Sequence, residues 1–86
     1  MSAPGEHDLG RAPDVPLRVD HRTVSRRHAR VILSDDRAKA YLQHQGGLNG
    51  TRINGRLVEK LVLLSNGDVV RVGDVELRVA IVVEDA

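Results

Sequence analysis

The stretch from Val24 to Ala29 combines residue types that can hold an anion. Its sequence, Val-Ser-Arg-Arg-His-Ala, places a serine directly before two arginines and a histidine three residues after the serine. Guanidinium groups are permanently charged and present planar hydrogen-bond forks that match phosphate oxygens, and a serine hydroxyl can donate one more bond. A polar loop with solvated arginines would have the same composition, so this candidate anion site needs support from elsewhere in the chain.

Two further stretches supply that support. Leu9-Gly10-Arg11 lies upstream, and the segment 47–55, Gly-Leu-Asn-Gly-Thr-Arg-Ile-Asn-Gly, lies downstream. With Gly-Arg, Ser-Arg-x-His and Asn-Gly-Thr-x-x-Asn-Gly in this order, the chain resembles the forkhead-associated (FHA) domain family from about Leu9 to about Ile81. The resemblance implies a small β-sandwich that binds a threonine-phosphorylated partner protein in signalling and is not an enzyme.

The resemblance also implies a role for each matching residue. Arg11 and Ser25 would contact the phosphate, and Arg26 would add a basic contact. Asn49 would hold the backbone of the bound peptide. Leu48 stands where the family tends to have serine or threonine, so only its backbone N–H would be available to the phosphate.

A second group of residues is expected to shape the site without contacting the ligand. The histidine would bond the backbone of its own loop, and the glycines would meet demands of backbone angles. For Asn54 a turn is sufficient explanation, because Asn-Gly is a common turn dipeptide. The group consists of Gly10, His28, Gly50, Thr51, Asn54 and Gly55.

Catalysis and metal binding have little support. Ser25 and His28 do not make a nucleophile–base pair on spacing alone, and no acid completes a triad. The four histidines match no standard ligand spacing and the chain has no cysteine. We therefore expect no metal and no cofactor.

Nucleic acid is a possible alternative ligand for the arginines at positions 22, 26, 27 and 30. The chain has a single aromatic residue, Tyr41, and a formal net charge of only +1. Base stacking and a strong basic field, which nucleic-acid binding uses, are therefore missing.

Composition bounds the fold. A chain of 86 residues makes one domain, and its core must consist of Val, Leu and Ile, which favour strands. The absence of cysteine and of any apolar run long enough to span a membrane makes a cytoplasmic protein the expectation.

Short apolar runs separated by turn residues predict an all-β sandwich or barrel. We expect a disordered lead-in over 1–8, an FHA-like domain over 9–83 and a tail over 84–86. Asn54-Gly55 predicts a hairpin turn. The segment 59–64 is expected to be loop plus a short strand. The remaining expected strands are 15–19, 29–33, 40–43, 51–53, 56–58, 69–72 and 75–83.

The chain departs from the family pattern before Gly10. The family usually carries one or two strands there, whereas this chain shows only a polar lead-in. Such a domain would have an uncovered sheet edge, which invites pairing with another chain. A phosphate-independent assembly module, working by strand addition or homo-oligomerisation, is therefore the alternative function. An incomplete fragment that folds poorly is a third possibility.

Overall fold

The computed structural model describes residues 5–36 and 38–81, and in this part of the chain all regular elements are β-strands. None of the described residues belongs to a helix that could cross a membrane. The strands are β1 (Glu6–Gly10), β2 (Leu17–Arg18), β3 (Ala29–Leu33), β4 (Ala40–His44), β5 (Thr51–Ile53), β6 (Arg56–Leu57), β7 (Val62–Leu63), β8 (Val69–Val72) and β9 (Val75–Arg78).

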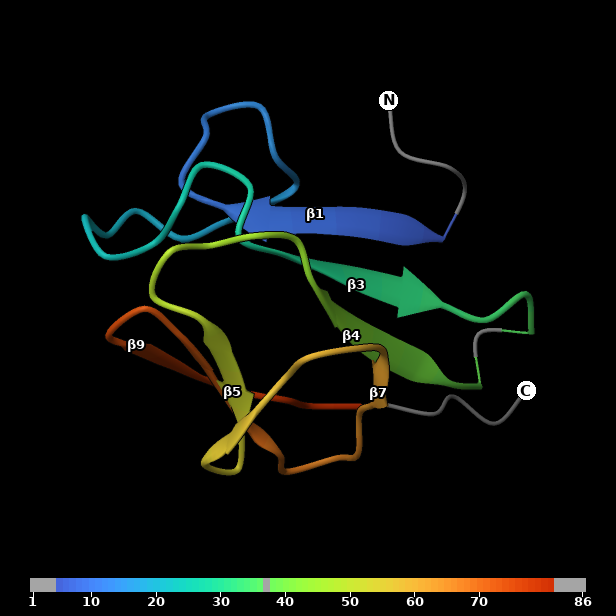
Figure 1. The fold of residues 1–86 in the computed structure, drawn as a ribbon. Helices are drawn as coiled ribbons and strands as arrows, with labels where there is room; N and C mark the ends of the chain where they lie inside the picture. Colours follow the sequence, from blue (N-terminus) through green and yellow to red (C-terminus); the bar gives the residue numbers. More distant parts are fainter. Residues whose placement is uncertain (1–4, 37, 82–86) are drawn as a thin grey trace.

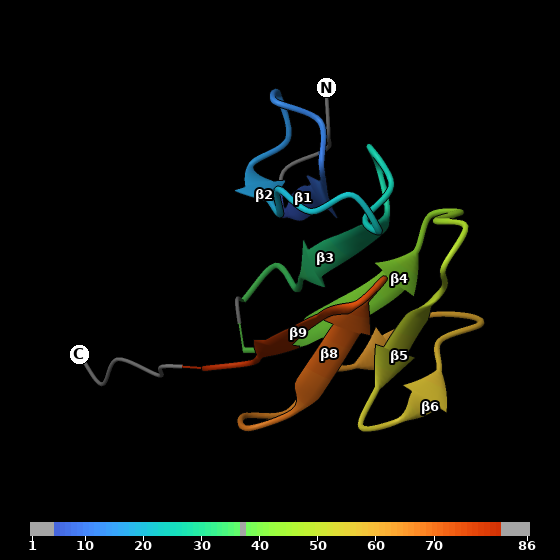
Figure 2. The same cartoon turned by 90° about the vertical axis from the view of Figure 1, so that its left-hand side faces the viewer.

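The strands form two sheets that pack face to face (Figures 1 and 2). One sheet has five strands in the order β2-β1-β3-β4-β7, and the other has four in the order β6-β5-β8-β9. All neighbours are antiparallel except β1 and β2, which run parallel with Leu9 beside Leu17. This arrangement confirms the predicted all-β sandwich.

The core between the sheets is aliphatic. Leu42 of β4 and Val72 of β8 come from different sheets and are each at most 1% exposed. Val24, in the loop before β3, and Ala29, the first residue of β3, are equally buried. Because the side chains along a strand alternate between faces, each short strand contributes only one or two core residues. Burial of small branched side chains therefore stabilises this fold without any aromatic anchor.

The hairpin predicted at Asn54-Gly55 is present. It joins β5 to β6, with Arg52 opposite Leu57 and Ile53 opposite Arg56. Asn54 has a positive φ of 49° and Gly55 one of 85°, as a tight turn between two strands requires. The segment 59–64 contains the short strand β7, as expected.

The disordered lead-in was wrong for Glu6, His7 and Asp8. These residues belong to β1, which pairs with β3 over Glu6↔Ile32 to Leu9↔Ala29. Asp8 is only 8% exposed. Partners on β3 and in the preceding loop make this burial possible, and a polar sequence does not reveal such partners.

The last strand is shorter than predicted. β9 ends at Arg78, whereas the sequence pattern favoured a strand over 75–83. Val79 still exchanges hydrogen bonds with Gly67 and Asp68, but β8 begins only at Val69, so no strand continues the pairing. Residues 82–86, which include the expected tail, lie outside the described residues.

Candidate functional site

Four connections meet at one end of the sandwich, which we call the loop end: 11–16, 19–28, 45–50 and 73–74. They lie on the left of Figure 1 and face the viewer in Figure 2. The stretches singled out in the sequence, apart from Asn54-Gly55, lie in these connections or at their borders. The fold therefore brings residues far apart in the chain to one surface.

Arg11 is fastened to the second of these connections. Its Nε donates to the carbonyl oxygen of Val24 at 3.0 Å, and its backbone N–H donates to that of Ser25 at 3.0 Å. The residue is exposed, and no carboxylate of the described residues forms an ion pair with it. Anchoring through Nε fixes the plane of the guanidinium group and leaves its two terminal amino groups as donors for a ligand.

Gly10 allows this close approach. A Cβ at this position would overlap the carbonyl oxygen of Arg26 and lie 2.9 Å from that of Ser25. The backbone N–H of Ala12 donates to the same Arg26 carbonyl at 3.1 Å. Only a residue without a side chain lets the end of β1 lie against this loop.

Ser25 faces the third connection. Its Oγ accepts a hydrogen bond from the backbone N–H of Leu48 at 3.2 Å, so its own hydroxyl proton stays available for donation. The Leu48 N–H was expected to be free for a phosphate, and in the structure it is engaged by Ser25 instead. The Leu48 side chain is 95% exposed.

Asn49, also in the third connection, is hydrogen-bonded to the second connection. Its Nδ2 donates to the carbonyl oxygen of Thr23 at 2.7 Å. The Thr23 hydroxyl in turn accepts the backbone N–H of Asp74 at 2.8 Å, across 51 positions of sequence. The Asn49 side chain is thus oriented with its amide oxygen left as an acceptor.

His28 is fully buried beneath these loops. Its Nδ1 accepts the backbone N–H of Ser25 at 3.1 Å, and its Nε2 lies 2.6 Å from the carbonyl oxygen of Gly50. Because Nδ1 accepts, Nε2 must carry the proton and donate to Gly50. One neutral imidazole therefore joins the loop that carries Ser25 to the loop that carries Asn49.

A second histidine packs against the first. The rings of His28 and His44 meet edge to face with centroids 5.8 Å apart, and His44 Nδ1 lies 2.8 Å from the hydroxyl oxygen of the fully buried Thr51. Burial, followed by the nearby His28, lowers the pKa of His44 below its ordinary value. The described residues contain no cluster of three or more side chains suited to a metal ion.

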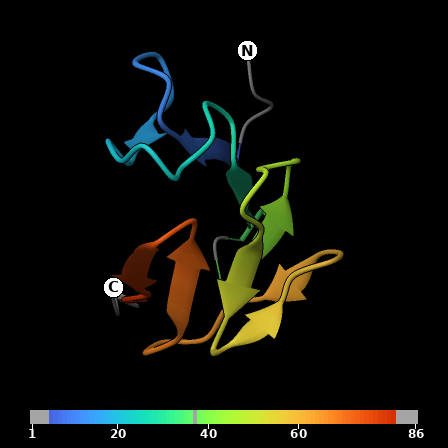
Figure 3. The ribbon, with the colours of Figure 1, turned by 60° about the vertical axis from the view of Figure 1, so that its left-hand side comes forward.

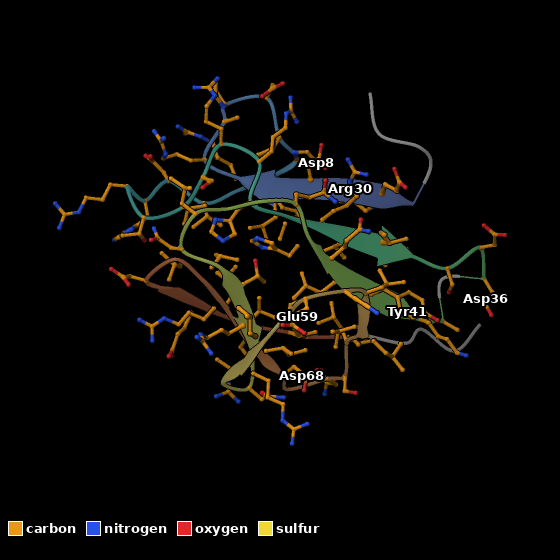
Figure 4. All side chains as sticks on the ribbon, in the orientation of Figure 1. Asp8, Arg30, Asp36, Tyr41, Glu59 and Asp68 are labelled. Atoms are coloured by element: carbon orange, nitrogen blue, oxygen red, sulfur yellow. The ribbon has the colours of Figure 1, made fainter. Side chains whose placement is uncertain are left out.

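The arginines of the 24–29 stretch separate into two kinds. Arg27 pairs with Asp8 at 3.1 Å and with Asp14 at 3.0 Å, and Arg30 pairs with Asp8 at 2.9 Å. Asp8 and Arg30 lie side by side on β1 and β3 (Figure 4), and the hydrogen bond that Arg30 donates to Asp8 raises the pKa of Arg30. Arg26 is exposed and has no carboxylate partner among the described residues.

Asn54 lies away from the loop end. Its Nδ2 donates to Asp68 at 2.9 Å and its Oδ1 accepts the N–H of Val69 at 3.0 Å. The bond from Asn54, together with the N–H of Ser65, lowers the pKa of Asp68, which Figure 4 places near β5 and β8. Asn54 and Gly55 thus close the opposite end of the sheet, in agreement with the turn explanation. The expectation that these two residues shape the site was wrong, because the Asn54 side chain bonds Asp68 and Val69 instead.

A cleft beside Asn49 contains arginines that the sequence analysis did not single out. Its volume is about 380 Å³. Arg52 of β5 and Arg71 of β8 lie directly opposite each other across the two strands. Arg71 pairs with Asp74 at 3.4 Å, whereas Arg52 has no carboxylate partner among the described residues. Alternation of Thr51, Arg52 and Ile53 was the available signal, since it places Arg52 on the outer face. The cleft is lined by Thr23, Asn49, Gly50, Arg52, Arg71, Gly73 and Asp74.

Comparison with known protein families identifies the FHA domain model over residues 7–73. The glycogen accumulation regulator GarA of Mycobacterium tuberculosis is 41% identical over 68 residues, which is 79% of this chain and 40% of the relative. The oxoglutarate dehydrogenase inhibitor of Corynebacterium jeikeium is 40% identical over 68 residues, 79% of this chain and 45% of the relative. This chain therefore spans less than half the length of the curated relatives it matches. Both names describe regulatory proteins.

Solved structures share the fold. A structure described as a functional analysis of phosphothreonine-dependent FHA domain interactions superposes with a TM-score of 0.85 at 31% identity, covering 93% of this chain and 80% of the other. The FhaA FHA domain in complex with the intracellular domain of Rv3910 superposes with a TM-score of 0.77 at 32% identity, covering 88% and 80%. These matches confirm the resemblance seen in the motifs.

Proposed function

Because this chain belongs to the FHA domain family, we propose that its loop end binds a phosphothreonine peptide of a partner protein. The chain acts by occupying that partner and carries out no reaction itself. The observation that carries this proposal is that hydrogen bonds within the loop end hold Arg11, Ser25 and Asn49 in place. Each is held by a hydrogen bond that leaves a further donor or acceptor for a ligand.

The phosphate is bound by charged and neutral donors together. Arg11 offers its terminal amino groups, Ser25 its hydroxyl, and Arg26 a further positive charge. Hydrogen bonds to charged groups contribute roughly 1.5–3 kcal/mol each. After the cost of ordering a flexible peptide is subtracted, the expected binding free energy is about −8 kcal/mol, which corresponds to micromolar affinity.

The peptide backbone is held by Asn49. Its Nδ2 is occupied by Thr23, so its amide oxygen accepts an N–H of the bound peptide. The peptide then runs over the cleft that Arg52 lines. Since Arg52 has no carboxylate partner among the described residues, an acidic side chain near the phosphothreonine is the favoured companion.

Titration by calorimetry against a phosphothreonine peptide library tests this function. Phosphorylated peptides should bind, and the same peptides without phosphate should bind at least about tenfold more weakly, because the charge-assisted bonds are lost. Arg11→Ala and Ser25→Ala should each weaken binding several-fold while the circular dichroism spectrum stays unchanged.

Arg56→Ala is the matched control, since Arg56 is an exposed arginine on β6 next to the Asn54-Gly55 turn, at the other end of the sheet. This variant should bind like the wild type. Equal affinity of the wild type for phosphorylated and unphosphorylated peptides would disprove the proposal. Phosphoserine versions of the best peptides measure the contribution of the threonine methyl group.

A further inference from the structure

The outer edge of β9 lacks a neighbouring strand in the described part of the chain. β9 is the last strand of the order β6-β5-β8-β9 and pairs on one side only, with β8. Figure 3 shows it at the rim of the sheet. The other rim strands, β2, β6 and β7, have two residues each, and such short edges give little room for pairing. With four residues, β9 is the longest of the rim strands.

The backbone groups that face this open side can be assigned from the pairing. Val79 exchanges hydrogen bonds with Gly67 and Asp68, so its N–H and C=O point toward the β8 side. In an antiparallel pair the bonded residues alternate along the strand. The backbone N–H and C=O groups of Val75 and Leu77 therefore also point toward β8. The N–H and C=O groups of Glu76 and Arg78 point outward, away from β8.

The side chains of these outward-bonding residues have opposite charges. Glu76 and Arg78 are both exposed, and neither has an ion-pair partner among the described residues. We propose that β9 pairs in antiparallel fashion with β9 of a second copy of this chain, about a two-fold axis at Leu77. In this register Glu76 lies opposite the partner's Arg78, and Arg78 lies opposite the partner's Glu76.

Backbone geometry and charge select the same register. Glu76 and Arg78 supply the outward N–H and C=O groups, so the positions that exchange hydrogen bonds are also the positions that carry complementary charges. A two-fold axis at Glu76 or at Arg78 would instead place two like charges directly opposite each other, which is destabilising. A symmetric dimer of this kind uses the same patch on both copies.

The inner face of β9 is apolar in this register. Val75, Leu77 and Val79 are half-buried and pack against the core. Leu77 meets the partner's Leu77 at a pair that exchanges no hydrogen bonds, where side chains come closest. Val79 lines a groove of about 470 Å³ together with Val31, Leu64 and Ile81, and it lies opposite the partner's Val75. The dimer thus removes apolar surface from water as it joins two four-stranded sheets.

Charge reversal tests this pairing in the 86-residue chain. Sedimentation equilibrium of the wild type should show mass rising with concentration from 9.4 kDa toward twice that value. Glu76→Arg and Arg78→Glu should each weaken dimerisation about tenfold, because two symmetric attractive pairs become repulsive. The double variant Glu76→Arg/Arg78→Glu should dimerise like the wild type, because it exchanges the charges without removing their complementarity.

Mixing the two single variants provides the sharpest measurement. One carries two arginines and the other two glutamates at these positions, so the mixture should form a heterodimer although each variant alone is largely monomeric. Circular dichroism of each variant checks that the fold is intact, and binding of a phosphothreonine peptide to each checks the loop end separately. A wild type that stays monomeric at millimolar concentration overturns the proposal, and so does a dimer that all four proteins form equally well.

Discussion

Nδ1 of His28 accepts a hydrogen bond from the backbone N–H of Ser25 at 3.1 Å. On its other side the same ring meets the carbonyl oxygen of Gly50 at 2.6 Å. A fully buried side chain thus sets the distance between the two loops that are proposed to contact the phosphopeptide. The spacing between the Ser25 hydroxyl and the Asn49 amide oxygen depends on this ring.

Replacing His28 with alanine should damage both stability and binding. The change removes two hydrogen bonds and leaves a cavity at a fully buried position, at a cost of about 3 kcal/mol. Chemical denaturation should show this loss, and phosphopeptide affinity should fall at temperatures where the variant is still folded. His7→Ala, at a half-buried position of β1, is the control and should leave affinity unchanged. Wild-type affinity in folded His28→Ala would contradict the role assigned to the ring.

Acidification should destabilise the fold through His44. Its pKa is lowered from the ordinary value of 6.5 by burial and by His28. The unfolded chain therefore binds a proton at a pH where the folded protein does not, and stability falls as the pH decreases below about 6.5 toward the folded pKa. Above this range the group contributes no pH dependence. Thermal melts of the wild type and His44→Gln between pH 7.5 and pH 5.5, ~2 units across this window, should show a weaker pH dependence in the variant. Parallel profiles would exclude His44 as the cause.

The two Asn-Gly pairs should respond in opposite ways to alanine. Asn49→Ala should weaken phosphopeptide binding about fivefold with little change in melting temperature, because its amide is exposed and is proposed to hold the peptide backbone. Asn54→Ala should leave affinity unchanged and cost about 1–2 kcal/mol, because alanine tolerates a positive φ poorly and the bonds to Asp68 and Val69 are lost. A loss of affinity in Asn54→Ala would place that residue in the binding site after all.

Alanine variants of the neighbouring Arg26 and Arg27 should differ in their effects on stability and on phosphopeptide affinity. Arg27→Ala removes ion pairs to Asp8 and Asp14 and should lower stability by about 1 kcal/mol, with affinity retained. Arg26→Ala should retain stability and weaken phosphopeptide binding, with a smaller dependence of affinity on salt. The two variants make the same chemical change at adjacent positions, so each variant is the control for the other. Reversed outcomes would show that Arg27, rather than Arg26, reaches the ligand.

Sequence reasoning selected residues that the fold brings to one end of the sandwich, but it misjudged both ends of the strand order. Arg11, Ser25 and Asn49 could be singled out because they match the FHA family motif in order and spacing. Asp8 was not recognisable as a strand residue, since its burial depends on Arg27 and Arg30, and no local pattern announces that pairing. Arg52 and Arg71 were missed for a related reason: they become neighbours only when β5 pairs with β8. The engaged Leu48 N–H follows from loop geometry that residue types do not encode.

The hydrogen bond between the Thr23 hydroxyl and the N–H of Asp74 closes a span of 51 residues. Contacts of such high sequence separation form slowly and late, because closing the loop costs conformational entropy before the contact contributes any stabilisation. Partly folded molecules are therefore expected to lack the assembled loop end, however many local turns they have made. The proposed phosphopeptide binding would therefore require the completely folded sandwich.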